Sequence, residues 1–239
     1  MQIESKYFPV AVLGAGTMGE GIAQIVATSG HPVMLYDVSH EQTQGAIENI
    51  AKRLERSVNK ELITDEKRTQ ILANISPAQA LRELARAKLA IEAIIEDLGI
   101  KQEVFSQLES LLEADTILAT NTSSIDLNKM GSKLKHPQRL VGMHFFNPVH
   151  RMPLVEVVRG TKTSNTTIAT ICAQATSLGK VPVVTGDGPG FLVNRILLPY
   201  MNEAGFLLED GASVTEIDRA AKDFGMPMGP LRLVDEVGI

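Results

Sequence analysis

The sequence has a single cysteine and no tryptophan, and only 4% of its 239 residues are aromatic. Cys172 alone can form neither an internal disulfide nor a cysteine-based metal site, so we expect no bound metal and a reducing, cytoplasmic location. Basic residues are outnumbered by acidic ones, which gives a net charge of −5 and an isoelectric point near 5.6. This balance argues against a nucleic acid or an anionic membrane surface as a partner.

Uninterrupted apolar runs are missing as well. Glu20 is the only Asp, Glu, Lys or Arg between Lys6 and Asp37, but five glycines break this stretch. It also lacks the basic segment and continuous apolar core of a signal peptide, so we expect no membrane span. The content of 44% hydrophobic and 21% charged residues is instead typical of a folded globular chain.

The N-terminal segment has the pattern of a strand, a glycine turn, a helix and a second strand. Pro9 to Leu13 and Pro32 to Tyr36 are short apolar runs, and a helical pattern extends between them to about Ser29. Such a unit requires parallel pairing of its two strands. A longer helical region from His40 to about Asn74 follows, and Thr64 begins a new helix inside it.

Further apolar runs alternate with helical segments up to about residue 185. The apolar runs are Leu89–Ile95, Thr116–Thr120, Leu140–Phe146, Leu154–Val158 and Val181–Val184, and the helical segments include Lys101–Leu112 and Thr166–Leu178. This alternation predicts an α/β fold with a Rossmann-like, doubly wound, mostly parallel sheet. After the breaker cluster at 186–190 only helical patterns remain, at Phe191–Leu208, at Val214–Phe224 and from Leu231. We therefore expect a Rossmann-like domain at 1–187 and a partial all-α C-terminal domain at 188–239.

The glycine turn has the features of a dinucleotide site, because it follows a strand directly and opens a helix. Gly14 allows the tight turn, Gly16 leaves room for a pyrophosphate, and Gly19 lets the helix approach the sheet. The helix N-terminus supplies N–H groups to the phosphates. Asp37 ends the second strand, where a carboxylate can bind ribose hydroxyls and repels a 2′-phosphate, so we expect NAD rather than NADP. The alternatives are a purely structural turn and a helix-capping role for Asp37.

A candidate base lies at the end of a later strand. Hydride transfer from a carbinol carbon needs a group that removes the hydroxyl proton, and His144 lies near the end of its apolar run. Glu156 is the only acid in the next run, and burying its carboxylate is costly unless an imidazole or another donor pairs it. Ser123 follows another strand, and Asn194 opens the first C-terminal helix. Ser123 as a helix cap, Asn194 as a surface residue and His144 as a core-edge residue are the alternatives.

Six motifs, in order along nearly the whole chain, resemble the L-3-hydroxyacyl-CoA dehydrogenase family. They are Gly14-Ala15-Gly16-Thr17-Met18-Gly19, Asn121-Thr-Ser-Ser124, Met143-His-Phe-Phe-Asn-Pro148, Leu154-Val-Glu-Val157, Gly188-Pro-Gly-Phe-Leu-Val-Asn-Arg195 and Met226-Pro-Met-Gly-Pro230. The string from His144 to Glu156 is most similar to the dehydrogenase part of bacterial multifunctional fatty-acid oxidation proteins. The resemblance implies NAD-dependent oxidation of an L-3-hydroxyacyl-CoA to a 3-oxoacyl-CoA in fatty-acid β-oxidation.

The resemblance also implies roles for individual residues. His144 would be the general base and Glu156 its orienting partner, while Ser123 and Asn194 would position the substrate's oxygens. Residues matching the nicotinamide half of the cofactor site are Glu96, Lys101 and Asn147, and residues on the helix after Asp37 that could contact coenzyme A are Asn49 and Arg56. Alternatively, Lys101 and the basic face of that helix are solvated, and Glu96 forms a strand-end pair with Asp97.

Two other functions stay open on the sequence alone. One is a dehydrogenase of a free 3-hydroxy acid or sugar acid, and the other is a non-catalytic NAD-binding structural homologue, since lens crystallins resemble this family. Because family members continue with further helices beyond the position of Ile239, we expect a fragment or a processed form of a longer chain. We also expect a homodimer or a place in a multifunctional β-oxidation complex.

Overall fold

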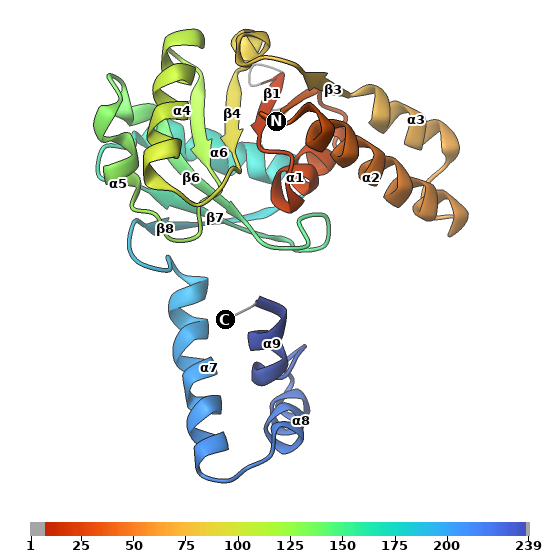
Figure 1. Cartoon of the computed structure of the whole chain (residues 1–239), viewed down its shortest axis with the longest axis vertical. Coiled ribbons are helices and arrows are strands. Elements are labelled where there is room, and N and C mark those ends of the chain that lie inside the picture. The colour runs from red at the N-terminus through yellow and green to blue at the C-terminus, as the bar shows by residue number, and fades with distance from the viewer. Residues whose placement is uncertain (1–7, 238–239) are drawn as a thin grey trace. The chain divides into compact units, whose positions relative to one another are not determined.

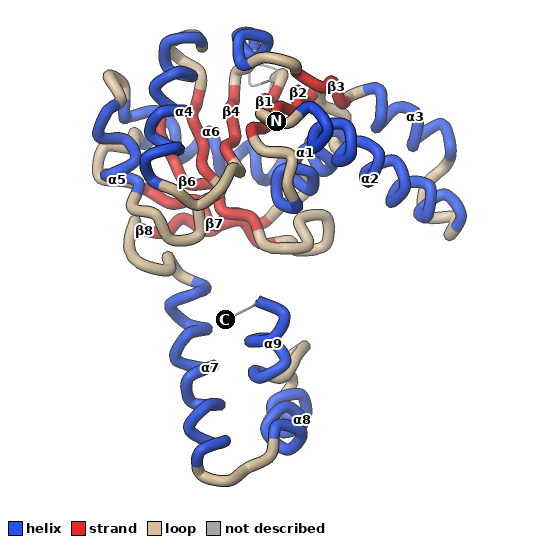
Figure 2. Tube along the Cα trace, in the orientation of Figure 1, coloured by secondary structure: helices blue, strands red, loops and turns tan. Residues whose placement is uncertain are grey.

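The computed structural model describes residues 8–237, which divide after Pro189 into two compact units (Figures 1 and 2). In the first unit, strands and helices alternate along the chain, and in the second only helices occur among the described residues. None of the helices in the described part is long and apolar enough to span a bilayer.

One sheet organises the first unit. Its strand order is β3-β2-β1-β4-β5-β6-β7-β8, and all neighbouring strands are parallel except β6 and β7. The predicted doubly wound, mostly parallel sheet is thus confirmed. The strands are β1 (Val10–Leu13), β2 (Val33–Tyr36), β3 (Ile75–Ala78), β4 (Leu89–Glu92), β5 (Ile117–Thr120), β6 (Leu140–Phe145), β7 (Leu154–Arg159) and β8 (Val181–Gly186).

Helices cover both faces of this sheet. On one face, α1, α2 and α6 contribute side chains to one apolar core, and on the other α4 and α5 contribute to a second. The helices are α1 (Thr17–Thr28), α2 (His40–Asn59), α3 (Asp65–Ala73), α4 (Leu98–Leu111), α5 (Leu127–Met130) and α6 (Asn165–Ser177), with short 3₁₀ turns at Leu81–Arg86, Gly131–Lys133 and Pro137–Arg139. In Figure 2, α2 and α3 run beside each other beyond the β3 edge of the sheet.

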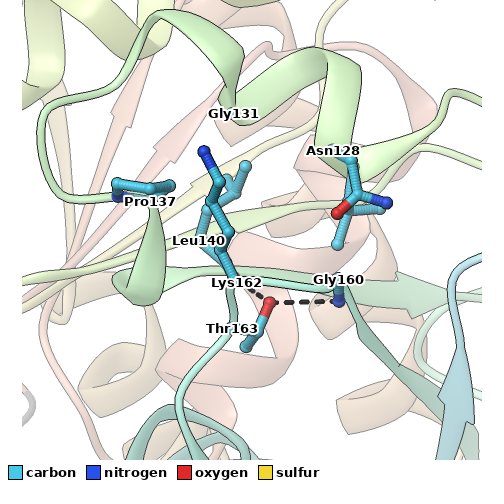
Figure 3. Close-up of a pocket in the computed structure, with 8 residues that line it drawn as sticks. Asn128, Gly131, Pro137, Leu140, Gly160, Lys162 and Thr163 are labelled. Atoms are coloured by element: carbon cyan, nitrogen blue, oxygen red, sulfur yellow. Dashed lines mark hydrogen bonds between the residues drawn. The ribbon is translucent and has the colours of Figure 1, made fainter.

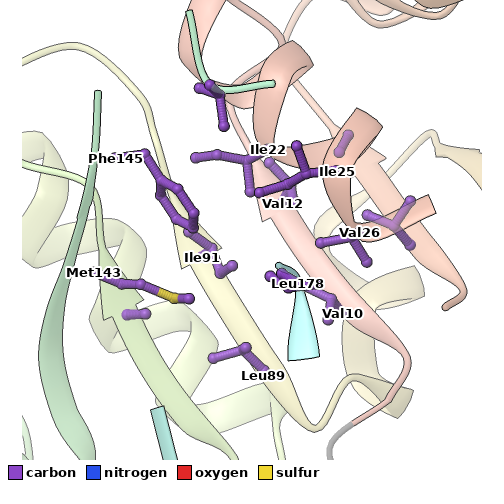
Figure 4. Close-up of a cluster of buried hydrophobic side chains, with 14 of the residues drawn as sticks. Val10, Val12, Ile22, Ile25, Val26, Leu89, Ile91, Met143, Phe145 and Leu178 are labelled. Carbon is purple, nitrogen blue, oxygen red and sulfur yellow. The ribbon is translucent and has the colours of Figure 1, made fainter. Parts of the chain in front are cut away.

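Alternating side chains of β1 serve the two cores. Val10 and Val12 join the first core and Ala11 and Leu13 the second, as the two-residue period of a strand requires. Figure 4 shows the first core, where Ile22 of α1 lies among strand residues such as Phe145. Complete burial of such a side chain contributes about 1.5–3 kcal/mol, so both faces hold the strand in place.

Two elements differ from the sequence expectation. β3 contains Pro77 and has exposed residues at its centre, so its sequence lacks an apolar run. Proline is tolerated there because β3 is an edge strand. The strand expected at Leu89–Ile95 ends at Glu92, whose Oε1 accepts a hydrogen bond from the Ile94 N–H (2.8 Å) and turns the backbone away from the sheet.

The second unit contains α7 (Val193–Glu209), α8 (Val214–Phe224) and α9 (Pro230–Val237). Ser213 and Glu216 form a reciprocal capping box at the start of α8, and Gly225, with φ of +113°, ends that helix. The Asp218 carboxylate of α8 accepts the Leu231 N–H at 2.9 Å, which anchors the start of α9. These contacts join α8 to α9, and α7 packs against both helices.

Candidate active site and cofactor site

The glycine turn between β1 and α1 has the geometry of a phosphate-binding loop. Gly14 has φ of +97°, and a Cβ there would lie 2.4 Å from the Ala93 carbonyl oxygen. A Cβ on Gly19 would lie 1.8 Å from the Gly14 oxygen, whereas a Cβ on Gly16 would meet nothing within 4 Å. Gly16 is also the N-cap of α1 and no side chain caps the helix. The turn is therefore tightly packed on the protein side, and free N–H groups remain for an anion.

Asp37 lies at the end of β2 beside this turn. Its Oδ2 accepts the Ala15 N–H at 2.8 Å, and its Oδ1 accepts the Ser39 N–H at 2.9 Å. Ser39, not Asp37, is the N-cap of α2, so the capping alternative for Asp37 is wrong. An NAD molecule fits these residues, because the uncapped helix suits its pyrophosphate and the carboxylate suits a ribose.

His144 and Glu156 form a buried pair on adjacent strands. They face each other in the antiparallel register of β6 and β7, and the distance from His144 Nδ1 to Glu156 Oε2 is 2.6 Å. Their side chains are only 9% and 1% exposed. The carboxylate fixes the orientation of the ring. The Phe146 ring, 4.6 Å away between centroids, adds a further wall beside the imidazole.

The loop after β5 lies beside this pair. Asn121 Oδ1 accepts the Phe145 N–H at 2.8 Å and thereby joins the ends of β5 and β6. Ser123 lies two residues further on, and its N–H donates to Glu96 Oε1 at 3.1 Å. Ser123 does not cap a helix, because the N-cap of α5 is Asp126. The structure thus brings the Ser123 loop and His144 to the same edge of the sheet.

A buried ion-pair cluster lies at the carboxyl end of β4, between β1 and β5. Lys101 Nζ lies 2.6 Å from Glu92 Oε1 and 3.0 Å from Glu96 Oε2. Glu92 also accepts the Thr120 hydroxyl at 2.6 Å. Lys101 is 1% exposed, so it is not a solvated helix charge. The alternative pairing of Glu96 with Asp97 is also wrong, since Asp97 caps α4 instead.

Glu96 is ionised under ordinary conditions. Burial by itself raises the pKa of this carboxyl, but the hydrogen bond from the Thr122 hydroxyl, the Lys101 charge and the Ser123 N–H together hold the pKa below its usual value. Glu92 accepts hydrogen bonds from three donors, on Lys101, Thr120 and Ile94. By the formal charges of its side chains, the cluster contains two negative charges and one positive charge.

The remaining predicted residues lie apart from these groups or in another unit. Asn147 is exposed in the loop after β6, and Asn194 lies in the first turn of α7, in the second unit. Asn49 of α2 is exposed and donates to Glu20 Oε2 of α1 at 3.1 Å. Arg56, also on α2, is exposed.

A groove of about 320 Å³ runs between α1, α2 and the loops before β7 and β8. Ile25, Leu54 and Leu178 form part of its apolar lining, and His150 and Lys180 supply nitrogen atoms. Burial lowers the pKa of His150, and the positive charges of Arg53, Arg151 and Lys180 lower it further. Cations thus gather beside an apolar surface.

A second hollow is drawn in Figure 3, between Asn128, Pro137, Leu140 and Lys162. Its volume of about 10 Å³ suits a single water molecule at most. The Thr163 hydroxyl already bonds the Gly160 N–H and the Leu140 carbonyl beside it. This hollow is a packing feature rather than a ligand site.

Four functional candidates were missed on the sequence, namely Glu92, Glu20, Arg53 and Lys180. Glu92 had a usable signal, because a lone acid that ends the run Leu-Ala-Ile needs a buried partner. Glu20 and Arg53 form an ion pair between α1 and α2, and only the packing of the two helices reveals it. Lys180 lies between two loops, where its Nζ donates to the Met152 carbonyl at 2.8 Å.

The fold and the glycine turn are those of a dinucleotide-binding domain. Residues 9–188 match the family described as "3-hydroxyacyl-CoA dehydrogenase, NAD binding domain", and residues 190–239 match "3-hydroxyacyl-CoA dehydrogenase, C-terminal domain". The chain therefore belongs to the 3-hydroxyacyl-CoA dehydrogenase family. The expected enzyme class and the expected NAD cofactor are thereby confirmed at the level of the family.

Named relatives come from bacteria. The chain is 44% identical over 229 residues to the fatty acid oxidation complex subunit alpha of Psychrobacter arcticus, a match covering 96% of this chain and 32% of that protein. It spans about a third of the length of the curated relatives it matches. Among solved structures, (S)-3-hydroxybutyryl-CoA dehydrogenase of Ralstonia eutropha is 40% identical with a TM-score of 0.92, covering 95% of this chain and 81% of that one. The 3-hydroxybutyryl-CoA dehydrogenase of Escherichia coli is 43% identical with a TM-score of 0.92, and the match covers 95% of this chain and 49% of that one.

Proposed function

We propose that this chain oxidises an L-3-hydroxyacyl-CoA to the 3-oxoacyl-CoA with NAD as hydride acceptor. The observation that carries the proposal is the buried His144–Glu156 pair at 2.6 Å, at the sheet edge where the glycine turn also lies. In doubly wound sheets, ligands bind at the carboxyl ends of the strands. A base at this edge therefore lies on the side where a dinucleotide binds.

In the proposed reaction, His144 Nε2 removes the proton from the oxygen of the substrate hydroxyl, while the hydride leaves the carbon that carries this hydroxyl. NAD, when bound, supplies the hydride acceptor. Glu156 positions the ring and stabilises the positive charge that the imidazole acquires. Ser123 and Asn194 position the substrate's oxygens, and Asp37 binds the adenosine ribose and selects against a 2′-phosphate.

The groove beside α2 supports an acyl-CoA rather than a free hydroxy acid. Coenzyme A carries phosphates together with a long, partly apolar linker, and the groove combines the Lys180 charge with an apolar lining. Asn49 and Arg56 stay candidate contacts on the same helix. A small hydroxy acid would make no use of these groups.

The organisation of the chain follows from the same proposal. We assign cofactor binding to residues 1–187 and completion of the substrate site to 188–239. The match to a subunit of a fatty acid oxidation complex supports a role in β-oxidation, as a homodimer or within a multifunctional assembly in the cytoplasm.

The test is an NADH-absorbance assay with acetoacetyl-CoA, compared with free acetoacetate. We expect turnover only with the thioester, and we expect His144→Gln to lower it by about 10²–10⁴-fold while the Kd for NADH stays nearly unchanged. His136→Gln, at an exposed histidine, is the matched control. Turnover of the free acid alone would favour a hydroxy-acid dehydrogenase, and NADH binding without any turnover would favour a non-catalytic homologue.

A further inference from the structure

The cluster of Glu92, Lys101 and Glu96 carries one negative charge more than it neutralises. Lys101 lies between the two carboxylates, at 2.6 Å from Glu92 and 3.0 Å from Glu96. Glu92 is completely buried and bonded by three donors, whereas the Glu96 side chain is 38% exposed. The Lys101 charge therefore balances the inner carboxylate, and Glu96 presents the excess negative charge toward the exposed side.

The position of this excess charge matters for the cofactor. Dinucleotides bind across such a sheet with one nucleotide over each half. Asp37 at the end of β2 marks the half that takes the adenosine, so the nicotinamide half belongs over β4, β5 and β6. Glu96 follows β4 and accepts from the loop after β5, through Thr122 and Ser123. It is thereby held on the nicotinamide side.

The two redox forms of NAD differ in charge at the nicotinamide ring. The oxidised ring carries a positive charge and the reduced ring is neutral, so a nearby fixed anion stabilises only the oxidised form. We propose that Glu96 is a specificity-determining residue that favours the oxidised over the reduced cofactor, with Glu92 acting as a positioning residue that holds Lys101. This inference rests on the proposed function, because it requires NAD to bind at the edge described above.

Donors on both sides fix the position of the Glu96 carboxylate. Thr122 and Ser123 donate to Oε1 while Lys101 contacts Oε2, so the carboxylate is held from both sides. A charge fixed in this way needs no reorganisation when the ring becomes oxidised or reduced, which makes its effect larger than that of a mobile surface acid.

The experiment compares the Kd values for NAD and NADH in four proteins, with NADH measured by fluorescence and NAD by competition. Glu96→Gln removes the charge and keeps the shape, and Glu96→Asp keeps the charge and shortens the side chain. The matched control is Glu103→Gln, at an exposed acid on α4, the helix that follows Glu96 and contains Lys101. We expect Glu96→Gln to raise the ratio of Kd for NAD to Kd for NADH at least about threefold, with the ratio unchanged in the other two variants.

Each other result overturns the inference. If Glu96→Gln lost affinity equally for both cofactors, Glu96 would contribute only hydrogen bonds. The same conclusion would follow if Glu96→Asp shifted the ratio of Kd values as much as Glu96→Gln does. An unchanged ratio would show that its charge does not act on the nicotinamide. Failure of the proposed function looks different, since the wild-type protein would then show no turnover of the thioester whatever the ratio.

Discussion

Replacing Glu156 by Gln tests the proposed base most directly. The substitution keeps the size of the side chain but removes the charge 2.6 Å from His144 Nδ1. A hydrogen bond to a charged group contributes about 1.5–3 kcal/mol. Its loss here would mainly destabilise the state in which the imidazole is protonated. At about 1.4 kcal/mol per factor of ten, kcat should fall about 10- to 150-fold.

A further readout separates this loss from a general structural defect. The Kd for NADH should stay within about twofold of the wild-type value, and the exposed Glu48→Gln variant should behave like the wild type. Single-turnover NADH absorbance measures the rate. A kcat within about twofold of wild type would refute the role of Glu156.

Three further substitutions test the turn and the end of β8. Gly16→Ala should keep the stability within about 1 kcal/mol yet weaken NAD binding about tenfold or more, because the open space beside Gly16 is where the pyrophosphate approaches. Gly19→Ala should instead lower the free energy of unfolding by at least about 2 kcal/mol, since its Cβ would overlap the Gly14 oxygen. Denaturant titration distinguishes the two variants, and equal stability of Gly16→Ala and Gly19→Ala would contradict the packing argument. Burial raises the pKa of Asp187 and the neighbouring Asp126 charge raises it further, so the native state favours the protonated acid and stability is lost as pH rises from about 4. Asp187→Asn should flatten this decline above about pH 4, and parallel stability curves for the two proteins would speak against it.

Local pattern was sufficient where one element determines the geometry. The β1 run, the glycine turn and the start of α1 are contiguous in sequence, and each glycine has a steric reason that the spacing already implies. The same holds for α8, whose predicted bounds Val214–Phe224 match the structure because Ser213 caps its start and Gly225 its end. β3 was missed for the converse reason, since its pairing with β2 compensates for a sequence without strand character.

Long-range pairs were predictable only in part. Glu156 needed a partner wherever it was buried, but the register that places it opposite His144 depends on the connection between β6 and β7, which is too long to act as a tight turn. Lys101 was placed at the cofactor site only by the family resemblance, with a solvated helix charge as the alternative, because the sequence does not indicate that Glu92 ends its strand directly against α4. Charge clusters between helices and strands can therefore be identified only from the tertiary structure.

The exposed carboxylate of Glu96 and the buried carboxylate of Glu156 would stabilise opposite ends of the proposed reaction. With NAD bound, the proposed hydride transfer would remove the positive charge from the nicotinamide ring, and proton transfer would create one on His144, so a single positive charge would in effect cross the site. Glu96, held by Lys101 at 3.0 Å, favours the state before transfer. Glu156, 2.6 Å from the imidazole, favours the state after it. Because each anion stabilises a different end of the same charge displacement, the pair can hold the two bound states close in free energy, which lets the reaction run readily in either direction.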